Sequence, residues 1–286
     1  EKVFGYPPTA VRVAVDGLAV YVHKDCPLTE LTMEQVDAIF SATRKGGMAE
    51  ITTWGELGLT GEWADKPIRL YGRNSASGTY QYFKEHALYK GDFKDSVKEQ
   101  PGSASVVRSV AEDPTALGFV GFSYISHSKA LAVRAEGTAA LKPEALSVST
   151  EDYLLARHLY FYTAGNASPE VTEFIEFVQS TAGQAIVAQT GFVAQNVFVA
   201  RVQPTPGNPS EYYDVIGHAD RLSMTFRFRP ASSTLDSRAL RDIERLSAFM
   251  RLPENQHKEL RLAAFSPKAE RARLMTLLTL NDRVDH

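Results

Sequence analysis

The stretch Pro67-Ile68-Arg69-Leu70-Tyr71-Gly72-Arg73-Asn74-Ser75-Ala76-Ser77-Gly78-Thr79-Tyr80 decides the fold class, because one structural pattern gives way to another within it. Residues 67–72 predict a strand. Residues 80–89 predict a helix, with Tyr82, Phe83, Ala87 and Leu88 turned inward on one face. A loop of mostly small residues, 73–79, joins the two. A strand that leads directly into a helix is typical of an α/β domain.

Strands and helices alternate on both sides of this stretch. The apolar run at residues 11–22 predicts strands buried on both faces, with Asp16-Gly17 as a turn or bulge within it. Residues 31–40 predict a helix with Thr32 as its N-cap. Further helices are expected at residues 106–111 and 169–179, and further strands at 117–121 and 159–163. The alternation predicts a mainly parallel or mixed sheet.

The composition excludes several classes of protein. The 286 residues carry a formal net charge of −3, so a global basic surface for nucleic acid is absent and an anion ligand would need a local positive site. The single cysteine, Cys26, excludes an intramolecular disulfide and is expected to be inert. No apolar run approaches the roughly 18 residues that span a bilayer. The sequence starts at Glu1 without a visible signal peptide, so we expect a removed leader or a larger missing segment.

The composition changes after residue 200. Three prolines between Arg201 and Ser210 predict a linker, which we place at residues 201–214. Beyond it, residues 222–228 alternate with period two and predict a half-exposed strand, and residues 236–250 predict an amphipathic helix. A second strand at 260–265 and a final helix from about residue 269 complete this part.

The loop Arg73–Thr79 carries the chemistry of an anion site. The first turn of a helix presents unpaired N–H groups and a partial positive charge, and Gly78 lets the backbone approach a ligand closely. Ser77 and Thr79 add hydroxyl donors, and the planar guanidinium of Arg73 can hold two oxygens. The alternative is that Ser77 or Thr79 simply caps the helix while Arg73 is solvated. No P-loop or Rossmann glycine pattern is present.

The same residues resemble a known family. Gly72–Thr79, followed by Tyr82-Phe83, resembles the Arg-x-x-x-Ser-Gly-Thr loop of the phosphate-binding subunits of phosphate importers. Four further stretches resemble family segments in the same order: Ala14–Val20, Leu31–Trp54, Ala116–Gly121 and Gly183–Val193. The resemblance covers about residues 5–196, and five ordered motifs are more specific than any one of them.

The resemblance implies a fold and a function. The fold is a type 2 periplasmic binding protein over residues 1–200, with lobe I at about 1–68 and 159–200, lobe II at about 69–158, and the ligand between them. The family's opening residues, which include a further anion loop, lack a counterpart here. The implied function is a non-catalytic phosphate-binding protein of the periplasm or cell envelope that delivers phosphate to an ABC importer or senses it.

The resemblance also implies the site residues. Arg73, Ser77, Gly78 and Thr79 would hold phosphate oxygens, and Asp16 would complete the site. An ionised carboxylate only accepts hydrogen bonds, so it can bond to hydrogen phosphate, which carries a proton, but repels sulfate, which does not. The alternative for Asp16 is a turn residue before Gly17.

The C-terminal segment resembles part of a second family. Thr225–Asp236, the following helix and Leu260–Ser266 resemble the start of an OmpA-like domain, so residues 215–286 are expected to form a partial, small α+β domain of that type. The family binds peptidoglycan, but Pro267 stands where its ligand aspartate is expected, and Arg283 matches its ligand arginine. The alternative function is therefore a cell-wall-associated structural or interaction protein with a degenerate binding domain.

An enzyme is not expected. The sequence contains no H-E-x-x-H, no G-x-S-x-G and no paired cysteines, and its seven histidines include no i, i+4 pair. We therefore expect no metal, no cofactor and no catalytic residues. The enzymatic alternative is a phosphatase, which would need a nucleophile or a metal cluster near the Arg73–Thr79 loop.

Overall fold

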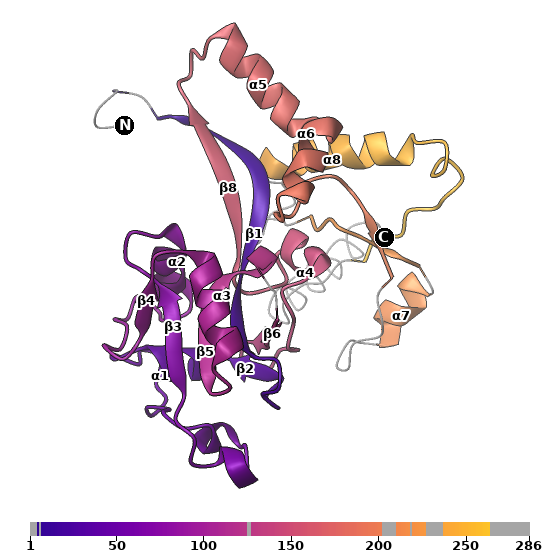
Figure 1. Ribbon diagram of the computed structural model, residues 1–286. Helices are drawn as coiled ribbons and strands as arrows, with labels where there is room; N and C mark the ends of the chain where they lie inside the picture. Colours follow the sequence, from indigo (N-terminus) through magenta and orange to yellow (C-terminus); the bar gives the residue numbers. More distant parts are fainter. Residues whose placement is uncertain are drawn as a thin grey trace, which may run out of the picture. The chain divides into compact units, whose positions relative to one another are not determined.

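The protein divides into two units, Glu1–Asn196 and Val197–His286, in a computed structural model (Figure 1). The structure describes residues 5, 7–124, 127–201, 210–217, 219–226 and 237–263. Within these ranges, no helix is long and apolar enough to cross a membrane. The two units are described one at a time.

The first unit is organised by one long strand, β1 (Thr9–His23), which changes partners along its length. Its first part, through Gly17, pairs antiparallel with β8 (Ala156–Thr163). From Leu18 onward it pairs antiparallel with β5 (Ala116–Gly121), and near its end also with β6 (Ser128–Ala130). The predicted turn at Asp16-Gly17 is wrong, because the strand continues through both residues and its only irregularity lies between Arg12 and Ala14.

The sheet around β5 is mixed, as the alternating pattern predicted. Its strand order is β4-β3-β5-β1-β6, with β8 added on β1. β3 (Arg69–Arg73) runs parallel to β5 and to β4 (Lys98–Gln100). The strand edge that matters for function is the one where the parallel strands β3 and β5 both end.

Helices and short elements cover this sheet. The longer helices are α1 (Met33–Phe40), α2 (Gly78–His86) and α3 (Ser103–Glu112), and α4 (Ala145–Ser149) is shorter. Thr32 caps α1 in a capping box with Gln35, which confirms the predicted N-cap. A parallel pair, β2 (Glu30–Thr32) with β7 (Ala132–Arg134), and three 3₁₀ turns, Gly55–Leu57, Gly61–Trp63 and Phe122–Tyr124, complete this part.

An aromatic cluster forms the core between α1, α2 and the sheet. Phe83 of α2 stacks on Phe119 of β5 with 3.9 Å between ring centroids, and Phe40 of α1 meets both rings edge-on. All three are fully buried. Most members of this hydrophobic core lie between Leu18 and Leu155, and Val15 and Val193 also belong to it. The division into two lobes stays a prediction from the sequence.

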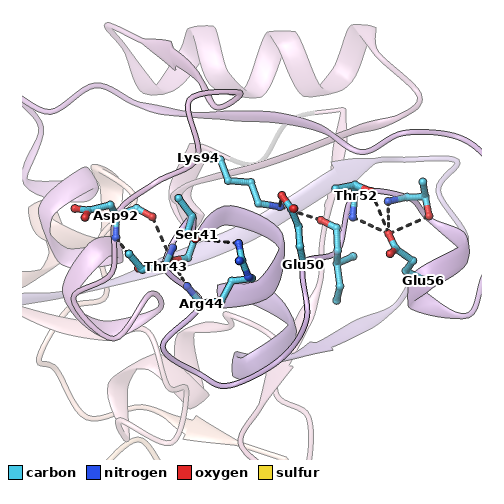
Figure 2. A network of polar contacts seen from close by, with 11 residues as sticks. Ser41, Thr43, Arg44, Glu50, Thr52, Glu56, Asp92 and Lys94 are labelled. Carbon is cyan, nitrogen blue, oxygen red and sulfur yellow. Dashed lines mark hydrogen bonds and ion pairs between the residues drawn. The ribbon is translucent and has the colours of Figure 1, made fainter.

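Polar contacts fasten the loop after α1 to the segment after α2 (Figure 2). Ser41 Oγ accepts from the backbone N–H of Thr43 and of Arg44 and donates to the carbonyl of Asp92, 3.2 Å away. The Nζ of Lys94 lies 3.0 Å from a carboxylate oxygen of Glu50. These contacts hold the segment after α2 against the loop after α1.

The far end of the first unit carries β8, α5 (Pro169–Gln179) and α6 (Thr181–Gln189), as Figure 1 shows. α5 has the predicted bounds and the predicted proline at its first turn. Three glutamine side chains cover the edge of β1 here: the amides of Gln179 and Gln195 donate to Arg12 O, and that of Gln184 donates to Val13 O.

The second unit is described only in part. It contains a small antiparallel pair, β9 (Val199–Ala200) with β10 (Arg221–Leu222), and the helices α7 (Ser210–Ile216) and α8 (Ser237–Met250). α8 confirms the predicted amphipathic helix. Residues 210–214 belong to α7 and not to a linker, because they follow the last proline and Glu211 suits the first turn of a helix.

The predicted strands of the second unit differ from the structure. Residues 223–226 and 260–263 are not strands; of the described residues in the two predicted strands, Leu222 alone is paired, as part of β10. Most of the linker, at 202–209, and Pro267, Arg283 and the final helix lie outside the described residues. The alternating pattern at 222–228 covers few residues, and a short strand also needs a neighbouring strand of matching length to pair with.

We expect Gly72→Ala to destabilise the protein. A Cβ at Gly72 would lie 2.4 Å from Cε1 of Phe119, and that ring cannot move away because Phe83 stacks on it. Overpacking of this kind costs about 1–3 kcal/mol. Gly165→Ala is the matched control, since nothing lies within 4 Å of a Cβ there. Urea unfolding compares the two; equal midpoints would mean that the core accommodates the extra carbon.

Candidate functional site

The candidate site lies where the parallel strands β3 and β5 end. Arg73 is the last residue of β3, and Gly121 is the last residue of β5, its parallel neighbour. α2 begins soon after β3, at Gly78. In open α/β sheets, ligands bind outside the carboxyl ends of the strands, so this edge is the expected place for a site.

α2 begins at Gly78, two residues before the predicted start at Tyr80, and ends at His86 instead of Tyr89. Ser77 is the N-cap, and its Oγ accepts a hydrogen bond of 3.1 Å from the backbone N–H of Thr79. Ser77 and Thr79 are buried, but Gly78 is exposed and a Cβ there would meet nothing within 4 Å. The N–H of Gly78 is one of the first-turn donors that have no partner within the helix. Space for a ligand and a free donor therefore coincide at Gly78.

Arg73 is held by the turn that leads into α3. Its Nη1 donates to Ser103 Oγ at 2.8 Å, and its Nη2 donates to Pro101 O at 3.3 Å. Its Nε is buried and has no acceptor among the described residues. A buried donor without an acceptor carries a desolvation cost, so an anion that reaches this nitrogen would be favoured. The alternative of a freely solvated Arg73 does not fit these contacts.

Asp16 is buried in β1, with 2% of its surface exposed. Its Oδ2 accepts two hydrogen bonds from Arg157, from Nε at 3.0 Å and from Nη2 at 2.7 Å. Its Oδ1 is buried and has no donor among the described residues. Gly121 leaves room on that side, since a Cβ there would lie 3.5 Å from Oδ1. Asp16 thus keeps one acceptor oxygen unused.

Arg157 is the site residue that sequence reasoning missed. It lies on β8 directly opposite Asp16, and it also donates to Gly78 O at 3.1 Å and to Thr79 Oγ1 at 3.4 Å. The signal in the sequence was an arginine next to the predicted strand at 159–163, among apolar residues. Its partner is far away along the chain, so only the strand pairing reveals it.

The structure brings part of the predicted site together. Asp16, Gly78 and Thr79 all contact the guanidinium of Arg157. Ser77 joins them through its bond to Thr79 N, whereas the hydrogen bonds of Arg73 go to Pro101 and Ser103. The alternative that Ser77 caps the helix agrees with its observed contact. The alternative that Asp16 is a turn residue does not agree with its position inside β1.

Two tyrosines near the site are held as neutral donors. Burial raises the pKa of Tyr82, whose hydroxyl donates to Ala156 O at 2.6 Å. Burial, with Tyr153 and Asp16 adding to it, raises the pKa of Tyr21, whose hydroxyl donates to Gly121 O at 2.6 Å. These bonds fasten α2 to β8 and β1 to β5.

Comparison with known proteins establishes the family. The PBP superfamily domain matches residues 2–182, well over half of the chain. The chain belongs to the PBP superfamily. "Phosphate-binding protein PstS" of Pseudomonas aeruginosa is 50% identical over 200 residues, covering 68% of this chain and 62% of the relative. The protein of the same name from Bacillus subtilis is 30% identical over 183 residues, covering 64% and 56%. The chain thus spans about three fifths of the length of these relatives.

Solved structures of PBP-type proteins share the fold. An ABC-type phosphate transport receptor from Vibrio cholerae matches with a TM-score of 0.56 at 22% identity, covering 68% of this chain and 75% of that one. A putative phosphate ABC transporter substrate-binding protein from Clostridium perfringens, solved with bound phosphate, matches with a TM-score of 0.51 at 26% identity, covering 65% and 72%. The predicted mixed α/β class of the N-terminal part is confirmed; the OmpA-like domain stays a prediction from the sequence.

We expect Ser77→Ala to lower the stability of the protein, because it removes the cap of α2. Loss of an N-cap hydroxyl typically costs about 0.5–2 kcal/mol. Ser168→Ala is the matched control, since Ser168 is the N-cap residue of α5 but makes no capping bond to that helix. Chemical denaturation of the two variants measures the difference. An equal loss in both would show that the bond from Thr79 N contributes nothing.

Proposed function

We propose that this chain binds hydrogen phosphate without transforming it. The observation that carries the proposal is a buried, unpaired acceptor, Asp16 Oδ1, together with a buried, unpaired donor, Arg73 Nε, among the described residues. A protonated oxyanion offers both a proton for the acceptor and oxygens for the donor. The exposed first turn of α2 adds the N–H of Gly78, the kind of donor that binds phosphate in many proteins.

Each site residue has a proposed role. The guanidinium of Arg73 and the N–H of Gly78 hold ligand oxygens, and the hydroxyl of Thr79 donates to another. Ser77 shapes the turn through its bond to Thr79 N. Asp16 accepts the proton that distinguishes hydrogen phosphate from sulfate. Charge-assisted hydrogen bonds contribute roughly 1.5–3 kcal/mol each, so a few of them are enough for about micromolar binding.

The relatives supply the biological setting of the proposal. The names of the curated relatives describe phosphate-binding proteins, and two solved neighbours are described as parts of phosphate ABC transport. We propose the same ligand here, a location in the periplasm or cell envelope, and an ABC importer as the partner. Half of the sequence is shared with the Pseudomonas protein over the matched region, which supports the shared ligand.

We also propose that the protein is not an enzyme. Within the described residues, no group of three or more His, Cys, Asp or Glu side chains could hold a metal ion. Arg157, and not a nucleophile, occupies the position between Asp16 and Thr79. A phosphatase would release phosphate from p-nitrophenyl phosphate; we expect only competition between that ester and free phosphate.

The OmpA-like interpretation of residues 215–286 stays a prediction from the sequence. Its helix is present as α8, but Pro267 and Arg283, the positions on which peptidoglycan binding depends, lie outside the described residues. Pull-down of the full chain with purified peptidoglycan tests it independently of phosphate binding.

We expect Asp16→Asn to lower the preference for phosphate over sulfate by about tenfold or more, the effect of one charge-assisted hydrogen bond. Because Arg157 donates to one side of the side chain, the amide oxygen will face Arg157 and the NH₂ group will replace Oδ1. That NH₂ group can donate to either anion. Calorimetric titration with phosphate and sulfate measures the ratio. An unchanged ratio would remove Asp16 from the site.

Arg73→Ala should act differently. The guanidinium recognises charge and oxygen spacing but not protonation, so phosphate and sulfate should both bind less tightly by a similar factor of about 10–100, equivalent to one or two charge-assisted bonds. Arg134→Ala is the matched control, because Arg134 pairs with Glu30 on the separate β2–β7 sheet. A wild-type affinity in Arg73→Ala would contradict the assignment of Arg73.

A further inference from the structure

The contacts of Arg157 converge on the polar ends of the proposed site. Its Nε and Nη2 both donate to Oδ2 of Asp16, its Nη1 donates to Gly78 O, and its Nη2 also approaches Thr79 Oγ1. An arginine has five N–H donors, and four of them are used in these bonds. Arg157 therefore has little capacity left to bind a ligand itself.

The bonds to Asp16 select which carboxylate oxygen a ligand meets. Both donors go to Oδ2, so Oδ1 is the oxygen that stays free of any donor among the described residues. Arg157 thus determines the orientation of Asp16 and leaves Oδ1, and not Oδ2, as the acceptor that a ligand meets.

The bond to Thr79 orients a donor. A hydroxyl that accepts from a guanidinium directs its own proton elsewhere, because its lone pair faces the cation. The proton of Thr79 is then available to a ligand oxygen. One cation thereby sets Asp16 as an acceptor and Thr79 as a donor, the combination that a protonated oxyanion requires.

Arg157 is not needed merely to hold α2 against β8. Tyr82 of α2 already donates to Ala156 O of β8 at 2.6 Å. Its ring also lies under the guanidinium, 5.4 Å from the carbon at its centre. The two elements are fastened one residue away from Arg157, and an apolar side chain at position 157 could pack on the same ring.

We propose that Arg157 is a positioning residue that sets the selectivity of this site for protonated oxyanions, an inference that rests on the proposed function. It acts through Asp16 and Thr79 and does not contact the ligand. Its loss changes which anion is preferred, and not only how stable the protein is. Without the two bonds to Oδ2, the carboxylate is no longer held with Oδ1 toward the ligand, so the contact that distinguishes a protonated oxyanion from sulfate is lost.

The test is calorimetric titration of the full chain with inorganic phosphate and with sulfate, combined with urea unfolding. Arg157→Gln should lower the phosphate-to-sulfate affinity ratio at least tenfold. In the Asp16→Asn background, Arg157→Gln should change the ratio much less than it does in the wild-type background, since the carboxylate through which Arg157 mainly acts is gone. Arg157→Lys keeps the positive charge but loses the planar guanidinium that donates two bonds to Oδ2 of Asp16. Its phosphate-to-sulfate affinity ratio should therefore fall between those of wild type and Arg157→Gln.

Two controls separate positioning from stability. Tyr82→Phe removes the bond to Ala156 O and should lower stability while the ratio stays as in wild type. Arg134→Gln breaks an ion pair outside the site and should change neither anion's affinity. If Arg157→Gln does not fold, the double variant with Asp16→Asn removes the unpaired buried charge, and Arg157→Lys provides the ratio.

The outcomes distinguish this inference from the function it rests on. If wild type binds neither anion, the proposed function is wrong and this inference falls with it. If wild type prefers phosphate and Arg157→Gln weakens both anions equally, the function stands and Arg157 is only structural. A lower ratio in Arg157→Gln but not in Tyr82→Phe supports the positioning role.

Discussion

The buried charge of Asp16 is the constraint on which the site depends. Burying a charged carboxylate in an apolar interior is costly unless a cation pairs with it, and Asp16 lies within a strand flanked by buried apolar residues. Arg157, opposite it on β8, is that cation. The pair lies where β1 leaves β8 and joins β5. The ion pair that balances the charge of Asp16 therefore also links β1 to β8.

The pairing is incomplete in a way that matters for chemistry. Arg157 satisfies one oxygen of Asp16, and the turn before α3 satisfies the terminal nitrogens of Arg73. Asp16 Oδ1 and Arg73 Nε stay unpaired within the described residues. Unpaired buried polar atoms are uncommon in folded proteins, since each costs about 1–3 kcal/mol. Under the proposed function, a bound oxyanion pairs with both atoms.

The sequence could predict the local parts of this arrangement but not its long-range part. The N-caps at Ser77 and Thr32 follow from side chains that bond two or three residues away, and both were predictable. The Asp16–Arg157 pair depends on strand pairing between distant segments, which composition and periodicity do not encode. The turn expected at Asp16-Gly17 was wrong because Gly17 serves a different purpose: a Cβ there would lie 2.8 Å from Cγ2 of Val148.

Leaving two polar atoms unpaired has a consequence for binding energy. The cost of burying them is already present in the free protein, so a ligand that pairs with both gains more than it would from exposed partners. Neither side chain has to be newly ordered, because Arg157 fixes Asp16 and Ser103 fixes Arg73. Preorganised donors and acceptors raise affinity by lowering the entropy lost on binding. A site of this kind needs little positive charge overall, which is consistent with anion binding by a chain whose net charge is −3.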